Sequence, residues 1–275
     1  DWPEGQSVWK CTLDGLEPHD TEQMVMAMTE SGRLPRQTVK EVVARTAGVP
    51  LFVEGLTRYI LESEPESEGL RPSRPAPSRE IPPSLSGLLT ARLDRLSPGD
   101  LEVAQHAATI GRVFGKDLLR ALTGQSDVHL DKSLRRLSDA QLILEQSVSE
   151  GSYVFKHALI QQAAYDMLLI TKRQECHRQL AITLEKDYPA LSTSHPELLA
   201  LHYHQSGPEF MQKALHYWQA AAQHALKRSD NAEAMAHLGQ ALALAALLPD
   251  GVERDLLELR LQPLLAPSQM AIFGW

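Results

Sequence analysis

Apolar residues recur at intervals of three and four along most of the chain, and this period predicts α-helices. In the N-terminal part, the pattern predicts a short strand at 7–13 (SVWKCTL), followed by helices at 20–29 and 36–46. Gly48 is expected to end the second helix, because glycine adopts the left-handed conformation at low cost. A third helix is expected to begin at Pro50, where the missing N–H of proline removes no hydrogen bond.

Residues 62–83 interrupt this pattern. Their sequence, ESEPESEGLRPSRPAPSREIPP, is rich in proline, serine and glutamate and nearly lacks large apolar side chains. A segment of this composition cannot bury enough apolar surface to offset the entropy lost on ordering. The sequence therefore predicts a flexible linker here, which separates residues 1–61 from the rest.

Helical spacing returns at Ser84, and a β-hairpin follows the helices. The expected helices are 84–95, 99–110, 115–122 and 128–140. Two short apolar runs, LILEQ and YVFKH, flank the polar turn SVSEGS, and this arrangement predicts a hairpin. Helices followed by a hairpin have the order of a winged-helix domain, which would span residues 84–157.

From His157 onward the pattern predicts helices alone, over residues 158–275. They are expected at 157–169, 172–187, 196–206, 210–228, 231–246 and 252–265. The last four pair as helix–turn–helix units, with alanine at close-packing points and a short turn at Ser229–Asp230. This is typical of tetratricopeptide-like repeats. The predicted fold class is mainly α: a helical bundle, a winged-helix domain with a short hairpin, and the start of a tetratricopeptide-like α-solenoid.

Composition and charge narrow the function. The formal net charge is -8, which disfavours a general nucleic-acid binder. No apolar run reaches the roughly 20 residues that span a bilayer. Cys11 and Cys176 are too few and too far apart for a disulfide framework, which indicates a reducing cytoplasm. The chain begins with Asp1, and its last residues, MAIFGW, lack the character of a helix cap or tail, so we expect a fragment of a longer protein.

Two motifs that suggest chemistry fail on spacing. GRVFGKD resembles a phosphate-binding P-loop, but it has three residues between its glycines instead of four, and Asp117 follows the lysine. A turn between helices, broken by Gly111 and Gly115, is the expected structure. His202 and His204 lie two positions apart, so they do not share a helix face as metal ligands would, and surface or interhelix histidines are expected. The chain shows no catalytic constellation.

A small basic cluster leaves nucleic acid as an alternative. Lys132, Arg135 and Arg136 would lie on the third helix of the winged-helix domain, which usually reads the DNA groove. A solvated helix face is the other interpretation, and the acidic net charge favours it.

Several phrases, in this order, resemble the STAND class of signalling ATPases. VVARTAGVPLFVEGLTRYIL is similar to the end of the nucleotide-binding unit in that class. IPPSLSGLLTARLDRLSPGDLEVAQHAATIGRVFG and YVFKHALIQQAAYDMLL are similar to the winged-helix region that follows it, and ALHYWQAAAQHALKRSDNAEAMAHLGQALAL to the first helical repeats. The set is most similar to the bacterial ATPase-plus-repeat module found behind class III adenylate or guanylate cyclase domains, and also to large LuxR-type regulators.

The resemblance implies a nucleotide switch that binds ATP or ADP with magnesium. Residues 1–61 would be the end of the nucleotide-binding core and its lid helices. Gly48 and Pro50 would match a Gly-x-Pro motif at the adenine edge, and His157 would match the histidine of the MHD motif, which reaches the phosphate. Ala158 replaces the aspartate of that motif, which puts any locking role of that acid in doubt. An ordinary helix-start histidine, bonded to a backbone carbonyl, is the alternative for His157.

The same comparison shows what these 275 residues lack. They contain no Walker A motif, Walker B motif or sensor segment, so this chain is not expected to hydrolyse ATP or to bind nucleotide tightly by itself. The expected role is the regulatory part of a switch that controls a cyclase or similar effector domain in the same protein. Its repeats would contact a signal ligand or a protein partner, and no membrane. A transcription regulator and a nucleotide-free scaffold remain alternatives.

Overall fold

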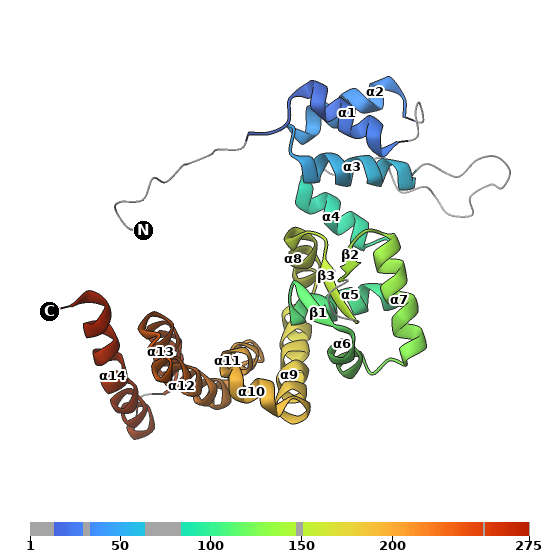
Figure 1. Ribbon diagram of the computed structural model, residues 1–275. Coiled ribbons are helices and arrows are strands. Elements are labelled where there is room, and N and C mark those ends of the chain that lie inside the picture. The colour runs from blue at the N-terminus through green and yellow to red at the C-terminus, as the bar shows by residue number, and fades with distance from the viewer. Residues whose placement is uncertain (1–13, 30–33, 64–83, 147–150, 250, 275) are drawn as a thin grey trace. The chain divides into compact units, whose positions relative to one another are not determined.

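The computed structural model describes residues 14–29, 34–63, 84–146, 151–249 and 251–274. It is mostly helical and contains one small antiparallel sheet (Figure 1). The chain forms two compact units, 1–96 and 97–275, each of which is described by itself. The predicted strand at 7–13 and the linker from residue 64 on lie outside the described residues.

The first unit is a small helical bundle, as the apolar pattern predicts. Its helices are α1 (Pro18–Met28), α2 (Arg36–Thr46), α3 (Pro50–Ser63) and α4 (Leu85–Leu93). Val25, Val42 and Leu56 are fully buried at the centre of α1, α2 and α3. Helix α4 packs on α3. The Leu88 side chain lies so close to Gly55 of α3 that a Cβ at position 55 would be 3.0 Å from Cδ2 of Leu88. The predicted domain boundaries at 61, 84 and 157 stay predictions.

The second unit begins with helices around a three-stranded sheet. Its elements are α5 (Pro98–Ile110), β1 (Val113–Gly115), α6 (Lys116–Thr123), α7 (Asp127–Asp139), β2 (Ile143–Glu145) and β3 (Ser152–Phe155). The strand order is β1–β3–β2, with both pairs antiparallel. Ile143 pairs with Phe155 across β2 and β3, which confirms the predicted hairpin.

Strand β1 corrects a prediction about GRVFGKD. The segment was expected to be a turn between two helices, but Val113 pairs with Val154 of β3. Gly111, with φ of 146°, does end α5, whereas Gly115 is the last residue of the strand. A three-residue strand has too short an apolar run to be recognised, and its partner lies about forty positions along the chain.

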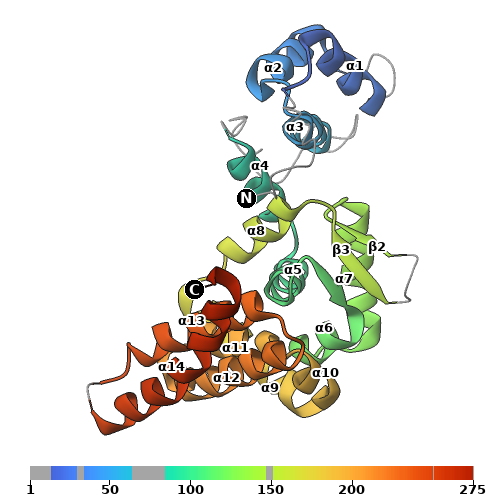
Figure 2. The same cartoon turned by 60° about the vertical axis from the view of Figure 1, so that its left-hand side comes forward.

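The second unit continues as an array of helices. These are α8 (Ala158–Asp166), α9 (Ile170–Asp187), α10 (Pro189–Ser194), α11 (Pro196–Gln205), the 3₁₀ turn η1 (Pro208–Phe210), α12 (Met211–Lys227), α13 (Asn231–Ala245) and α14 (Val252–Phe273). Figure 2 shows α11 to α14 side by side, each packed on the next in chain order, and α11 also packs on α9. Helix α10 was not predicted, and α14 extends beyond the predicted 252–265 despite Pro263 and Pro267.

Alanines bring the paired helices close together. Ala221, Ala222 and Ala225 of α12 are buried, as are Ala241 and Ala245 of α13. The predicted turn between these helices is confirmed: Ser229 has φ of 61°, and the Asp230 carboxylate accepts a hydrogen bond from the Glu233 N–H (3.0 Å) at the start of α13. No helix within the described ranges combines the length and the apolar character needed to cross a membrane.

Candidate functional site

Gly48 and Pro50 lie together at the turn between α2 and α3. Gly48 is buried with φ of 70°, and a Cβ there would lie 2.2 Å from the carbonyl oxygen of Leu16. The Leu16 N–H donates to the Gly48 carbonyl oxygen over 2.8 Å, which explains the close approach. Pro50 is exposed and begins α3 as predicted. Backbone geometry alone therefore requires glycine at position 48, whatever else the turn does.

His157 lies in the second unit, between β3 and α8. It is half-buried, and its extended backbone (φ −134°, ψ 142°) makes it the N-cap residue of α8. Its carbonyl oxygen accepts the Ile160 N–H at 3.0 Å. The predicted position at a strand-to-helix junction is confirmed, whereas the predicted nucleotide contacts of Gly48, Pro50 and His157 stay predictions.

One residue of the basic cluster on α7, Arg136, forms an ion pair within the fold. Arg136 donates to both carboxylate oxygens of Asp100, at 2.8 Å from Nε and 2.6 Å from a terminal nitrogen. The Asp100 side chain is 4% exposed. Burial alone would raise the pKa of Asp100, but hydrogen bonds from Arg136, Ser97 and Ser133 outweigh it and lower the pKa. Lys132 and Arg135 are exposed, so the cluster presents less charge to a phosphate backbone than its sequence suggests.

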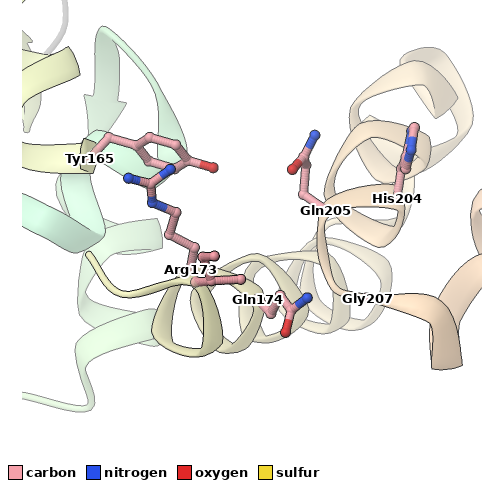
Figure 3. Close-up of a pocket in the computed structure, with 7 residues that line it drawn as sticks. Tyr165, Arg173, Gln174, His204, Gln205 and Gly207 are labelled. Carbon is pink, nitrogen blue, oxygen red and sulfur yellow. The ribbon is translucent and has the colours of Figure 1, made fainter. Parts of the chain in front are cut away.

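A polar pocket lies where α8 and α9 meet the end of α11. Its volume is about 260 Å³. Figure 3 shows Tyr165, Arg173 and Gln174 on one side, with His204, Gln205 and Gly207 across from them; Ile170 completes the lining. Arg173 is the lining residue with a permanent charge, and no carboxylate belongs to the lining. The arrangement is a small donor-rich cavity at the junction between the sheet-bearing part and the helical array.

Arg173 also holds the elbow between α8 and α9. Its Nε donates to the Leu168 carbonyl oxygen at 3.0 Å, and a terminal nitrogen donates to the Asp166 carbonyl oxygen at 2.9 Å. These carbonyls lie at the end of α8, where the last backbone carbonyls of a helix have no intrahelical N–H donor. The guanidinium carbon lies 4.6 Å from the centre of the Tyr165 ring, within the range of a cation–π contact. One side chain thus joins the pocket wall to the end of a helix.

Behind the pocket, a buried chain of hydrogen bonds connects α8, α9 and α11. The Tyr165 hydroxyl lies 2.9 Å from Nε2 of His177, and Nδ1 of His177 lies 2.9 Å from Nδ1 of His202. Both histidines are 5% exposed. Burial, helped by the nearby Arg173 charge, lowers the pKa of His177 to about 4, and burial beside His177 lowers that of His202 to about 3. Both rings are therefore neutral near pH 7.

A second polar cluster holds α9, α11 and α12 together. The Glu185 carboxylate accepts hydrogen bonds from the Tyr203 hydroxyl, from Nζ of Lys213 (2.7 Å) and from the Tyr217 hydroxyl (2.8 Å). Burial opposes ionisation of Glu185, but these three donors outweigh it and lower its pKa. The Tyr203 ring is fully buried and stacks on Tyr217 with centroids 5.7 Å apart. The polar groups of this cluster hydrogen-bond to one another across three helices, and these bonds stabilise the array.

Sequence reasoning placed only part of this site. His202 is an interhelix histidine as expected, and His204 reaches the pocket wall, but Tyr165, Arg173 and His177 were not singled out. The signal that could have found them is spacing: Arg173 and His177 lie four positions apart on one face of α9. Among the described residues, no three His, Cys, Asp or Glu side chains are arranged to hold a metal ion.

Comparisons with known proteins found a similar curated sequence and similar solved structures. No family model matches the chain. An uncharacterised protein of Rhizobium meliloti is 26% identical over 280 residues, which cover 100% of this chain and 26% of that protein. A crystal structure of a signal transduction ATPase with numerous domains (STAND), with a tetratricopeptide repeat sensor, from Pyrococcus horikoshii, aligns with 95% of this chain and 39% of its own, with a TM-score of 0.44 and 13% identity. The chain thus spans about a quarter of the length of its curated relative.

Proposed function

We propose that this chain is the regulatory part of an ATP/ADP-dependent signal-transduction switch, and that its helical array receives the signal. The observation that carries the proposal is the continuity of the second unit. Helix α8 begins directly after β3, packs against α5, and leads through the elbow into α9, on which α11 packs. A signal that shifts α11 against α9 would therefore act on the sheet-bearing part through one short connection.

Within this proposal, the segment from α5 to β3 is a winged-helix domain. The order helix, strand, helix, helix and hairpin supports the assignment, as does the pairing of β1 with the edge of β3 opposite β2. The paired helices α12 and α13, with alanines at their contact, support a tetratricopeptide-like array whose exposed surface takes a protein partner or a signal ligand.

The nucleotide contacts are part of the same proposal. Gly48 and Pro50 lie at the adenine edge, and His157 donates from its ring to a phosphate oxygen, a hydrogen bond that strengthens when either group is charged. Mg²⁺ and most phosphate contacts come from a P-loop core outside these residues. The effector is a nucleotide cyclase or a similar domain of the same protein.

Calorimetry tests whether nucleotide binding requires parts of the protein outside this chain. We expect ATP and ADP to bind the complete protein, whereas the 275-residue chain alone should bind neither more tightly than roughly millimolar, about -4 kcal/mol. Micromolar binding by the chain alone would contradict the proposal, because it would mean that these residues form a complete nucleotide site.

A second candidate function is a nucleotide-free scaffold. The outer face of α14 favours it, because Val252, Leu256, Leu259 and Met270 are all about half exposed or more, at 74%, 49%, 65% and 50%. A LuxR-type regulator is a further alternative; a gel shift with DNA that weakens on substitution of Lys132 and Arg135 would favour it. An unchanged nucleotide affinity of the complete protein after substitution of His157 would favour the scaffold.

A further inference from the structure

The pocket at the α8–α9 elbow has the features of a site for a small anion. Arg173 supplies a permanent positive charge, and the amide groups of Gln174 on α9 and Gln205 on α11 supply N–H donors (Figure 3). No carboxylate belongs to the lining itself, although the Asp166 carboxylate pairs with Arg173 over 3.3 Å from outside the lining. The complementary ligand group is therefore an oxyanion that accepts several hydrogen bonds.

Size and shape narrow the class of anion. A volume of about 260 Å³ is below the usual range for drug-sized ligands, which favours a small ligand. A guanidinium can pair with a planar carboxylate through two parallel hydrogen bonds. The lining holds one permanent positive charge, which balances a single negative charge on the ligand and leaves the second charge of a phosphate dianion uncompensated. Ile170, which is 73% exposed, adds an apolar edge for a short carbon chain.

Arg173 can bind such a ligand without leaving its helix contacts. A guanidinium has five N–H donors, and the bonds to the Leu168 and Asp166 carbonyls use Nε and one terminal nitrogen. The other terminal nitrogen can donate to a carboxylate in the pocket. The Asp166 carboxylate lies 3.3 Å from the same terminal nitrogen that donates to the Asp166 carbonyl, so it does not occupy the nitrogen assigned to the ligand.

We propose that this pocket binds a small organic carboxylate between Arg173 on α9 and Gln205 on α11. The bound ligand bridges the elbow and the array and so stabilises one arrangement of the two. The binding is a property of this chain alone. The role of the bound carboxylate as the signal of the switch rests on the proposed function.

Opposite charge changes at Gln205 test the binding. Gln205 is exposed at the end of α11, so Gln205→Glu and Gln205→Lys change the charge of the wall without removing a core contact. The probe is butyrate, a singly charged carboxylate with a short carbon chain, titrated into the 275-residue chain and followed by the ring signals of His204 in NMR spectra. Its neutral amide, butyramide, and inorganic phosphate are titrated in parallel, and Gln240→Glu and Gln240→Lys on α13, outside the pocket, are the matched controls.

We expect saturable shifts of the His204 signals with butyrate and none with butyramide. Gln205→Glu should weaken butyrate binding by about tenfold, Gln205→Lys should strengthen it, and the Gln240 variants should match the wild type. The proposal is overturned if butyrate gives no saturable shift, if phosphate binds more tightly than butyrate, or if the Gln205 and Gln240 variants respond alike. A failed nucleotide test would overturn the switch and leave this binding result unaffected.

Discussion

The buried pair of His177 and His202 predicts that the second unit loses stability in mild acid. In the unfolded chain each ring binds a proton near pH 6.5. In the folded chain the pKa of His177 is lowered to about 4 and that of His202 to about 3. Between these values unfolding takes up protons, so the free energy of unfolding falls as the pH falls below about 6.5.

The size of the effect follows from the same shifts. From pH 7 to pH 5, each histidine lowers the free energy of unfolding by about 2 kcal/mol, or about 4 kcal/mol for the pair. That is a large share of the roughly 5–15 kcal/mol that stabilises a typical domain. Both rings are only 5% exposed, so solvent screens little of the effect.

Hydrogen exchange measured by mass spectrometry provides the assay, because it reports peptides of α9 and α11 separately from the first unit. The double variant His177→Gln, His202→Gln keeps polar side chains at both positions but cannot take up these protons. We expect its stability difference between pH 7 and pH 5 to shrink by about 4 kcal/mol, whatever its absolute stability. His129→Gln, at an exposed position, is the control and should retain the wild-type difference. An unchanged pH dependence in the double variant would refute the reasoning.

Three further substitutions test the structure. Gly48→Ala should destabilise the first unit by about 1–3 kcal/mol, because of its positive φ and the close backbone contact there, measured by exchange in α1 to α3. Asp100→Asn should lower the stability of the α5–β3 segment by about 1–3 kcal/mol in urea unfolding, since Arg136 loses a charged partner; an unchanged midpoint would contradict this. Glu185→Ala should lower the free energy of unfolding of the second unit by about 2–3 kcal/mol, because it leaves a buried tyrosine hydroxyl without its acceptor. Hydrogen exchange in α11 and α12 measures this loss, and Glu175→Ala, on the same helix as Glu185, is the control.

The sequence predicted helices and the hairpin well because their signals are local. The spacing of Leu130, Leu134 and Leu137 shows one face of α7, and all three are buried. Strand β1 was missed because its identity depends on pairing with β3, far along the chain. A local pattern cannot show such a partner.

The pocket was missed for a related reason. Arg173 looks like an ordinary surface arginine until its bonds to the end of α8 are seen, and His177 gains its role only from His202 on another helix. By contrast, Gly48 carried a local signal, a glycine after a helix, and the structure confirms its left-handed backbone. Chemistry assembled from several helices requires tertiary structure to be recognised.

The most direct test of the proposed switch is the ADP affinity of the complete protein, compared between wild type and His157→Ala. His129→Ala, at an exposed position on α7, controls for the loss of an imidazole. If His157 contacts the phosphate, calorimetry should show affinity reduced by about tenfold or more in His157→Ala and unchanged in His129→Ala. Equal affinities for all three proteins, or no ADP binding by the wild type, would contradict the account.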